Sequence, residues 1–196
     1  MVYRIFVEKK QGLDNEARAL AHEIRTFLGV DSLEKVRILN RYDVEGLSKE
    51  LMDRAVETVF SEPQLDNVYE TLEAGNSIVI AVEYLPGQFD MRASSAAQCI
   101  EIMSCEKAPV VKNARVYVLE GKLTEDDLAK IRHHLINPVE SREASLEMPK
   151  TLVTEYEIPT TVETLDGFTK LDDAGLLAFV KEKGLAMDLD DLCFPQ

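Results

Sequence analysis

Few side chains in this sequence have the types and spacing that chemistry requires. His133 and His134 are adjacent on a predicted helix, where neighbouring side chains point about 100° apart and do not easily share a metal ion. His22 lies in the middle of another predicted helix, and Cys99 has no histidine partner that would complete a nucleophile signature. We interpret these residues as surface or packing positions and predict no catalytic residue in the chain.

The acidic residues and glycines do not form a recognisable ion or phosphate site either. Asp188, Asp190 and Asp191 lack the glycine turn and the closing glutamate of a calcium loop. Gly87 and Gly121 are isolated turn residues and not parts of a phosphate-binding loop. We therefore predict that these 196 residues contain no metal site and bind no cofactor of their own.

Composition argues against several classes of partner. The formal net charge of -14 disfavours nucleic acid, because affinity for its backbone comes largely from Lys and Arg. No stretch approaches the roughly 20 apolar residues that span a bilayer, and the amino terminus lacks a signal peptide, so we expect a cytoplasmic protein. Cys99, Cys105 and Cys193 form no Cys-x-x-Cys pair, which predicts reduced thiols that mostly serve packing.

The elements that must position any site follow from hydrophobic periodicity. In the first half, residues 2–9 predict a strand and residues 15–28 a helix. Residues 36–44 predict an extended segment broken into two short strands near Asn40. Ser48 is placed to cap the helix that follows.

The second half has the same order of elements. Residues 77–84 predict a strand, residues 91–104 a helix, and residues 114–119 a second strand. Thr124 is placed to cap the last helix of this half. Each half is therefore strand, helix, strand, helix.

This order coincides with an internal repeat at one fixed offset of 75. Residues 5–12 recur in part as residues 80–87, and residues 42–46 recur in part as residues 117–121. We predict an α+β domain over residues 1–138, in which two ferredoxin-like units, 1–75 and 76–138, form a pseudo-dimer. The pattern is compatible both with one continuous sheet and with two sheets packed face to face.

The character of the chain changes after Pro138. Residues 139–171 are rich in Thr and Glu and predict a mostly extended linker, followed by a short helix from Asp172 to a stop at Gly184. We predict a hydrophilic linker domain over residues 139–196. The chain ends without a closing element, which indicates truncation before a further domain.

Two segments resemble a known family. Residues 85–99, Leu-Pro-Gly-Gln-Phe-Asp-Met-Arg-Ala-Ser-Ser-Ala-Ala-Gln-Cys, resemble a turn of the large single-chain phosphoribosylformylglycinamidine synthases, in which we expect Gln at Met91 and Asp at Ser94. Residues 135–145, Leu-Ile-Asn-Pro-Val-Glu-Ser-Arg-Glu-Ala-Ser, are similar to the segment that leads from the amino-terminal domain of these enzymes into their linker. The first half of the chain also resembles PurS, the small separate subunit of the multi-protein form.

The resemblance implies a place within a larger enzyme. In that family a fused PurS-like pair is followed by a linker domain and then by ATP-binding synthase and glutaminase domains, before which this chain would end. The parent enzyme uses ATP, Mg²⁺ and glutamine to convert formylglycinamide ribonucleotide into formylglycinamidine ribonucleotide in purine biosynthesis. None of that catalytic machinery is expected in these residues.

The resemblance also implies an architectural role. The PurS-like domain would bridge the synthase and glutaminase domains of the same polypeptide and help to shield the ammonia that passes between them, which requires a dry interface. The residues that we expect at interdomain contacts are Gln88, Phe89, Asp90, Arg92, Gln98, Asn137 and Arg142. The simpler interpretation of Asp90 is that it caps the helix that starts near Met91.

Two other functions are compatible with the sequence. A regulatory module of the ACT type that senses a small molecule is also built from paired ferredoxin-like units, with a glycine turn after the first strand, here Gly12 and Gly87. A scaffold that only self-associates is the third hypothesis.

Overall fold

The computed structural model describes residues 1–153, 161, 164–165, 167–185, 187–188 and 191. The chain divides into two compact units, Met1–Thr154 and Glu155–Gln196. The first unit contains a six-stranded antiparallel sheet with helices α1 to α4, and the second contains α5, so the chain is α+β as predicted. None of the helices in the described residues is both long and apolar enough to cross a bilayer.

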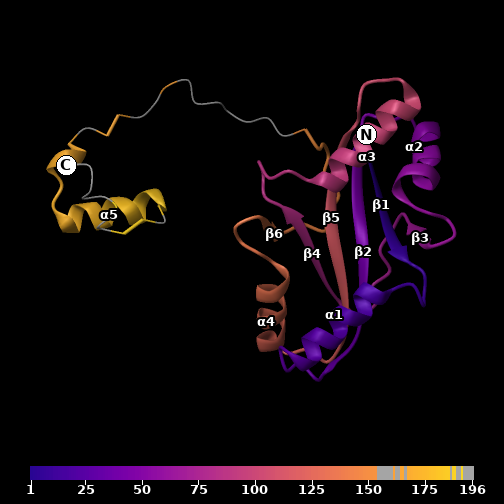
Figure 1. Ribbon diagram of the computed structural model, residues 1–196, viewed down its shortest axis with the longest axis horizontal. Helices are drawn as coiled ribbons and strands as arrows, with labels where there is room; N and C mark the ends of the chain where they lie inside the picture. Colours follow the sequence, from indigo (N-terminus) through magenta and orange to yellow (C-terminus); the bar gives the residue numbers. More distant parts are fainter. Residues whose placement is uncertain (154–160, 162–163, 166, 186, 189–190, 192–196) are drawn as a thin grey trace. The chain divides into compact units, whose positions relative to one another are not determined.

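The sheet is continuous through both halves of the repeat (Figure 1). Its strands, in spatial order, are β3 (Asp66–Tyr69), β1 (Val2–Lys9), β2 (Leu33–Glu45), β5 (Val110–Gly121), β4 (Ile78–Tyr84) and β6 (Ser141–Glu143). The long pairing of β2 with β5 joins the two halves. Of the two arrangements that the sequence allows, the structure therefore has the single sheet.

The strand registers of the two halves coincide at the offset of 75. Ile5 pairs with Tyr42, and adding 75 to both numbers gives the observed pair of Ile80 with Tyr117. The edge strands follow the same rule, because Glu8 pairs with Asn67 in the first half and Glu83 pairs with Arg142 in the second. At the centre, Asn40 pairs with Arg115, which is itself 75 residues away. An approximate two-fold axis between the paired registers therefore passes through this central pair.

Four helices cover one face of the sheet in two pairs. At one end lie α1 (Asn15–Thr26) and α4 (Glu125–Leu135), and at the other lie α2 (Lys49–Ala55) and α3 (Met91–Ser104) (Figure 1). The first pair packs on a core that includes Ile24 and Ile131, both completely buried. The second pair packs on a core around Ile100. Among helices α1 to α4, none lies over the middle of this face, between the two pairs (Figure 1).

The predicted helix caps are confirmed. The Ser48 hydroxyl accepts a hydrogen bond from the Leu51 amide at 3.2 Å, and Thr124 forms a reciprocal capping box with Asp127. In the second unit, Asp172 caps α5 (Asp173–Lys183), which ends at Gly184 in the left-handed conformation. After α2 the chain continues as a single π-helical turn, η1 (Val56–Phe60), which the sequence analysis did not anticipate.

The predicted break of the second strand at Asn40 is wrong. β2 runs without interruption through Asn40, which pairs with Val7 on one side and with Arg115 on the other. Asparagine has a low intrinsic preference for strands, but a residue held by ladders on both sides follows its neighbours. The irregularity in β2 lies instead near its start, where the register with β5 shifts between Leu33 and Lys35.

The boundary between the two units also differs from the prediction. Residues 139–153 belong to the first unit, which extends to Thr154 rather than ending at 138. The reason is β6, which pairs with the outer edge of β4 and satisfies backbone groups that an uncovered edge strand would leave unpaired. Residues 154–160, 162–163 and 166 of the predicted linker, together with Asp190 and Cys193, lie outside the described residues.

The face of the sheet opposite the helices carries a smaller core. Leu39 and Val116 are completely buried there, beside Phe6 and Ala144. Because no helix of the first unit packs on this cluster, residues that follow β3 and β6, among them Leu72 and Ala144, contribute to its burial.

Candidate functional site

The two segments that carry the family resemblance meet at one edge of the sheet. The Leu85 amide donates a hydrogen bond to the Glu140 carbonyl at 2.9 Å, and Tyr84 pairs with Ser141. The Arg142 guanidinium donates from Nε to Glu83 at 2.8 Å. We call this surface, formed by residues 84–91 and 137–142, the motif edge.

Local hydrogen bonds shape the turn from β4 into α3. Gly87 has a φ of +93°, which a residue with a Cβ adopts only with strain, and the Gln88 amide closes the turn on the Leu85 carbonyl at 3.0 Å. Asp90 accepts a hydrogen bond from the Ala93 amide at 2.9 Å and so caps α3. The interpretation of Asp90 as a cap is confirmed, and its carboxylate is engaged within its own helix.

The motif edge exposes large apolar side chains. Phe89 is 73% exposed, Met91 70% and Val139 77%. Gln88 and Arg142 are exposed beside them, whereas Gln98 is exposed farther along α3. Neighbouring apolar side chains that are this accessible are typical of a surface that meets another protein part.

Asn137 has a local role at this edge. Its side-chain oxygen accepts a hydrogen bond from the Val139 amide at 3.2 Å, and its carbonyl accepts from the Ser141 hydroxyl at 3.0 Å. These bonds hold residues 137–141 in a tight turn ahead of β6. Asn137, which is itself exposed, therefore positions the exposed Val139.

Arg92 connects the motif edge to a groove on the helix-covered face. Two hollows of about 800 Å³ and about 670 Å³ lie on this face, one between α1 and η1 and the other between α3 and α4. They share the lining residues Asn40, Tyr42, Val59, Arg92 and Arg115. We call the two adjoining hollows the central groove. It crosses the sheet where the central pair Asn40 and Arg115 lies.

The polar groups of the central groove are only partly matched. Arg92 donates to the Tyr42 hydroxyl at 3.4 Å, which is long for a hydrogen bond. Arg115 forms an ion pair with Glu16 of α1, but its Nε is buried and, within the described part of the chain, has no hydrogen-bond partner. Burial raises the pKa of the Tyr117 hydroxyl, so this group stays protonated at neutral pH.

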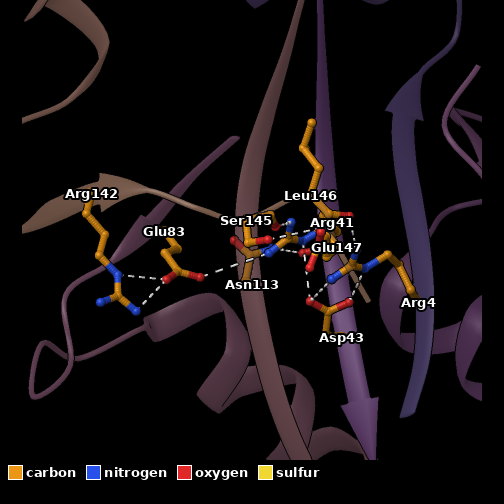
Figure 2. A network of polar contacts seen from close by, with 9 residues as sticks. All are labelled: Arg4, Arg41, Asp43, Glu83, Asn113, Arg142, Ser145, Leu146 and Glu147. Atoms are coloured by element: carbon orange, nitrogen blue, oxygen red, sulfur yellow. Dashed lines mark hydrogen bonds and ion pairs between the residues drawn. The ribbon is translucent and has the colours of Figure 1, made fainter. Parts of the chain in front are cut away.

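The opposite face carries a buried ionic network (Figure 2). Arg4 donates to both carboxylate oxygens of Asp43, at 2.5 Å and 2.9 Å. Arg41 lies 3.3 Å from the same carboxylate and 4.0 Å from Glu83. The side chains of Arg4, Arg41 and Asp43 are each less than a tenth exposed. Burial lowers the pKa of Arg41, and the adjacent Asp43 opposes that effect.

This network fastens the segment after β6 to the sheet. Arg4 donates to the Leu146 carbonyl and Arg41 to the Ser145 carbonyl, each at 2.7 Å (Figure 2). Glu45, at the end of β2, then accepts from the Leu152 amide at 2.6 Å and from the Thr151 hydroxyl at 2.9 Å. We call residues 144–153 the strap.

The end of the strap should respond to acid. The hydrogen bonds from Leu152 and Thr151 lower the pKa of Glu45 below its ordinary value of 4.5. A lowered pKa means that the stabilising contribution is complete above about pH 4.5 and is lost as the pH falls through the folded-state pKa. We expect the Leu152 amide resonance to titrate with a midpoint below 4.5 in NMR spectra, and this titration to vanish in Glu45→Gln. A midpoint at or above 4.5 would contradict the assignment of these hydrogen bonds.

The histidines and cysteines do not assemble into a site in the described residues. His22 and His133 are exposed, and His134 lies 3.3 Å from Glu23. Cys99 and Cys105 are free thiols as predicted, but both are exposed, so the prediction that they serve packing is wrong. Cys99 lines the hollow between α3 and α4 and Cys105 lies at the end of α3, placements that the weak amphipathic pattern of this helix did not reveal. Among the described residues, no three His, Cys, Asp or Glu side chains are grouped to hold a metal ion.

Sequence reasoning did not identify Arg4, Arg41 and Asp43 of the ionic network, or Arg115 of the central groove. Arg41 and Asp43 lie two positions apart on β2, so both face the same side of the sheet. Arg115 lies on the helix-covered face of β5. For Arg41 and Asp43, the charged residues at alternate positions in the second half of β2 were the available signal.

Neither the protein-family models nor the curated proteins compared with this chain give a match.

Proposed function

We propose that this chain is the amino-terminal assembly domain of a phosphoribosylformylglycinamidine synthase, built from two fused PurS-like, ferredoxin-like halves. The observation that carries the proposal is the meeting of the two resemblance segments at the motif edge. They are separated by most of the second half of the repeat, yet the Leu85 amide donates to the Glu140 carbonyl. Arg142 of the second segment also pairs with Glu83, two residues before the first segment. Segments that are both typical of one family and adjacent in space are expected if they form one working surface.

The internal repeat supports the same proposal. A fused pair of PurS-like subunits should show two halves with equal pairing registers, and the pairs Ile5 with Tyr42 and Ile80 with Tyr117 meet that requirement. Fusion across a common sheet would also place the longest strand pairing between the halves, as seen for β2 and β5.

In this role the motif edge contacts the synthase and glutaminase domains of the same cytoplasmic polypeptide. ATP, Mg²⁺ and glutamine act in those domains, and this chain contributes no catalytic group. Ammonia passing between the active sites must stay unprotonated and out of bulk water, which a closed apolar interface provides. The exposed side chains of Phe89, Met91 and Val139 are suited to form such an interface.

A reconstitution experiment tests the proposal. The 196-residue chain is mixed with a separately produced chain that carries the synthase and glutaminase domains, and glutamine-dependent amidation of formylglycinamide ribonucleotide is measured. We expect the mixture to couple glutamine hydrolysis to product formation and the catalytic chain alone to hydrolyse glutamine with little product. Equal coupling with and without this chain would contradict the assembly role.

Phe89→Asp should weaken this reconstitution. An aromatic side chain at the centre of an interface can account for about 1–2 kcal/mol of binding free energy, so we expect the concentration of this chain needed for half-maximal coupling to rise about tenfold. Phe27→Asp is the matched control, because Phe27 is 78% exposed at the end of α1, away from the motif edge. Equal effects of the two substitutions would show that the motif edge is not the contact surface.

Small-molecule sensing of the ACT type is the second candidate. The observation in its favour is that Gly12 and Gly87 occupy equivalent turns with nearly equal φ of +91° and +93°. Calorimetry of the isolated chain with amino acids distinguishes the candidates, because tight binding would favour sensing over assembly.

A further inference from the structure

We propose that the central groove binds a small organic oxyanion, a phosphate or a carboxylate carried on a flat apolar body, between Arg92 and Arg115. The proposal does not depend on the assembly role, since it is carried by the groove alone. Both arginines line both hollows and therefore lie where the hollows join. Arg92 and Arg115 are the cationic side chains that line both hollows, in a chain whose net charge is -14.

Arg115 has a hydrogen-bond donor that is not used within the described residues. Its Nη2 is engaged by Glu16, whereas its buried Nε has no acceptor among the described residues. A buried guanidinium N–H without an acceptor is unfavourable, and a second oxyanion is the group that would satisfy it most strongly. Arg92, exposed at the rim, has a single long hydrogen bond to Tyr42 in the described structure and can turn toward the same ligand.

The carboxylates around the groove are the second argument, because most of them are engaged elsewhere. Asp90 caps α3 and Glu83 pairs with Arg142. Glu16 neutralises one of the two arginines. Arg92 therefore keeps a positive charge with no carboxylate within ion-pair distance in the described residues, which leaves the junction able to attract an anion.

The walls define the rest of the ligand. Apolar and aromatic side chains line the hollow between α3 and α4, including Tyr117, Val82 and Leu135. The Tyr42 ring packs on Phe60 with centroids 4.7 Å apart, so its orientation is fixed. A hollow of about 670 Å³ with such walls suits a ring-sized body. Asn40, which also lines it, supplies an amide group for orientation, whereas the Asn113 amide already donates to the Arg41 carbonyl at 3.0 Å.

The test uses three ring compounds that differ only in the group attached: phenyl phosphate, benzoate and phenol. Each is titrated into the ¹⁵N-labelled 196-residue chain, and the arginine Nε–H resonances are followed by NMR. From the binding free energy per heavy atom that is usual for small ligands, we expect the better anion to bind with a Kd of about a few millimolar. It should shift the Arg115 Nε–H resonance, which is identified by its loss in Arg115→Lys. The stronger of the two anions identifies the oxyanion.

Two variants and one control make the outcome decisive. Arg115→Lys keeps the charge but removes the Nε–H, and Arg92→Gln removes the second cation, so each should weaken anion binding about tenfold. Arg132→Gln removes a surface arginine that pairs with Glu143 and should leave the Kd unchanged. Backbone amide spectra confirm that each variant is folded. No shift up to about 20 mM, an equal response to phenol, or unchanged binding in both arginine variants would overturn the proposal.

Discussion

Asp43→Ala destabilises the chain by about 3–5 kcal/mol. The substitution removes the carboxylate that accepts two hydrogen bonds from Arg4 and lies 3.3 Å from Arg41, and it leaves two buried guanidinium groups without their shared counter-charge. The free energy of unfolding, measured by chemical denaturation of the full chain, should show this loss. A domain of this size has a total stability of about 5–15 kcal/mol, so the variant is close to unfolding at ambient temperature.

Two comparisons separate a buried-charge effect from a general one. Asp53→Ala removes a carboxylate whose ion pair with Lys49 is mostly exposed, and it should change stability by less than about 1 kcal/mol. The double substitution of Asp43→Ala with Arg4→Met should lower the free energy of unfolding by less than the sum of the two single decreases. The reason is that the Arg4 guanidinium, which would be buried without a counter-charge in Asp43→Ala, is then absent. Equal effects at Asp43 and Asp53 would show that the network contributes no more than a surface pair.

Gly121→Ala is the second large effect, and the repeat provides its control at Gly46. Both glycines have a positive φ, +143° and +98°, so each substitution incurs about 1–2 kcal/mol of backbone strain. A Cβ on Gly121 would also lie 2.3 Å from the Ser32 carbonyl oxygen, whereas the nearest atom to one on Gly46 is 3.9 Å away. Because the clash is with backbone, we expect Gly121→Ala to lose at least about 2 kcal/mol more than Gly46→Ala.

The cause of this difference is the register shift in β2. It lies opposite Gly121, where Leu33 pairs with Gly121 and Lys35 with Glu120, and it brings the backbone of residues 32–34 close to the glycine. Denaturation midpoints of the two variants, measured side by side, give the comparison. Equal losses of stability at the two positions would mean that the two halves are equivalent here and that the register shift in β2 does not cause a clash at Gly121.

Sequence reasoning succeeded where a signal was local. The caps Ser48, Thr124 and Asp172 are short-range hydrogen-bond donors or acceptors next to a periodic helix, and each was found. The order of the longer elements followed from periodicity in the same way. The match of residues at the offset of 75 predicted two similar halves, but the equal strand registers are seen only in the structure.

The predictions that were missed or wrong concern segments whose conformation depends on the strands next to them. β6, Ser141–Glu143, is short and polar and has no alternation to recognise, and it is a strand because the edge of β4 offers it partners. Asn40 was expected to break a strand and does not, because ladders hold it on both sides. Both cases require knowledge of which strands lie next to each other.

In the candidate sites, too, contacts between residues close in sequence were predicted and contacts between distant residues were not. Asp90 was recognised as a cap because its partner, the Ala93 amide, is three residues away. The pairing of Arg4 with Asp43 spans 39 residues and that of Arg115 with Glu16 spans 99, so neither follows from spacing along the chain. The exposure of Phe89 likewise depends on the turn that Gly87 and Asp90 create together.

Asn40 and Arg115 pair on the approximate two-fold axis, and this position shows one advantage of having both halves in a single polypeptide. In a homodimer of identical chains, a residue on the axis faces its own copy, so an arginine there would meet a second arginine across the strands. Like charges directly opposite each other destabilise a sheet. Joining the copies in one polypeptide lets the two positions diverge, and here an uncharged amide faces the single guanidinium. Two halves of one polypeptide can therefore differ at this point, whereas two identical chains related by the axis cannot.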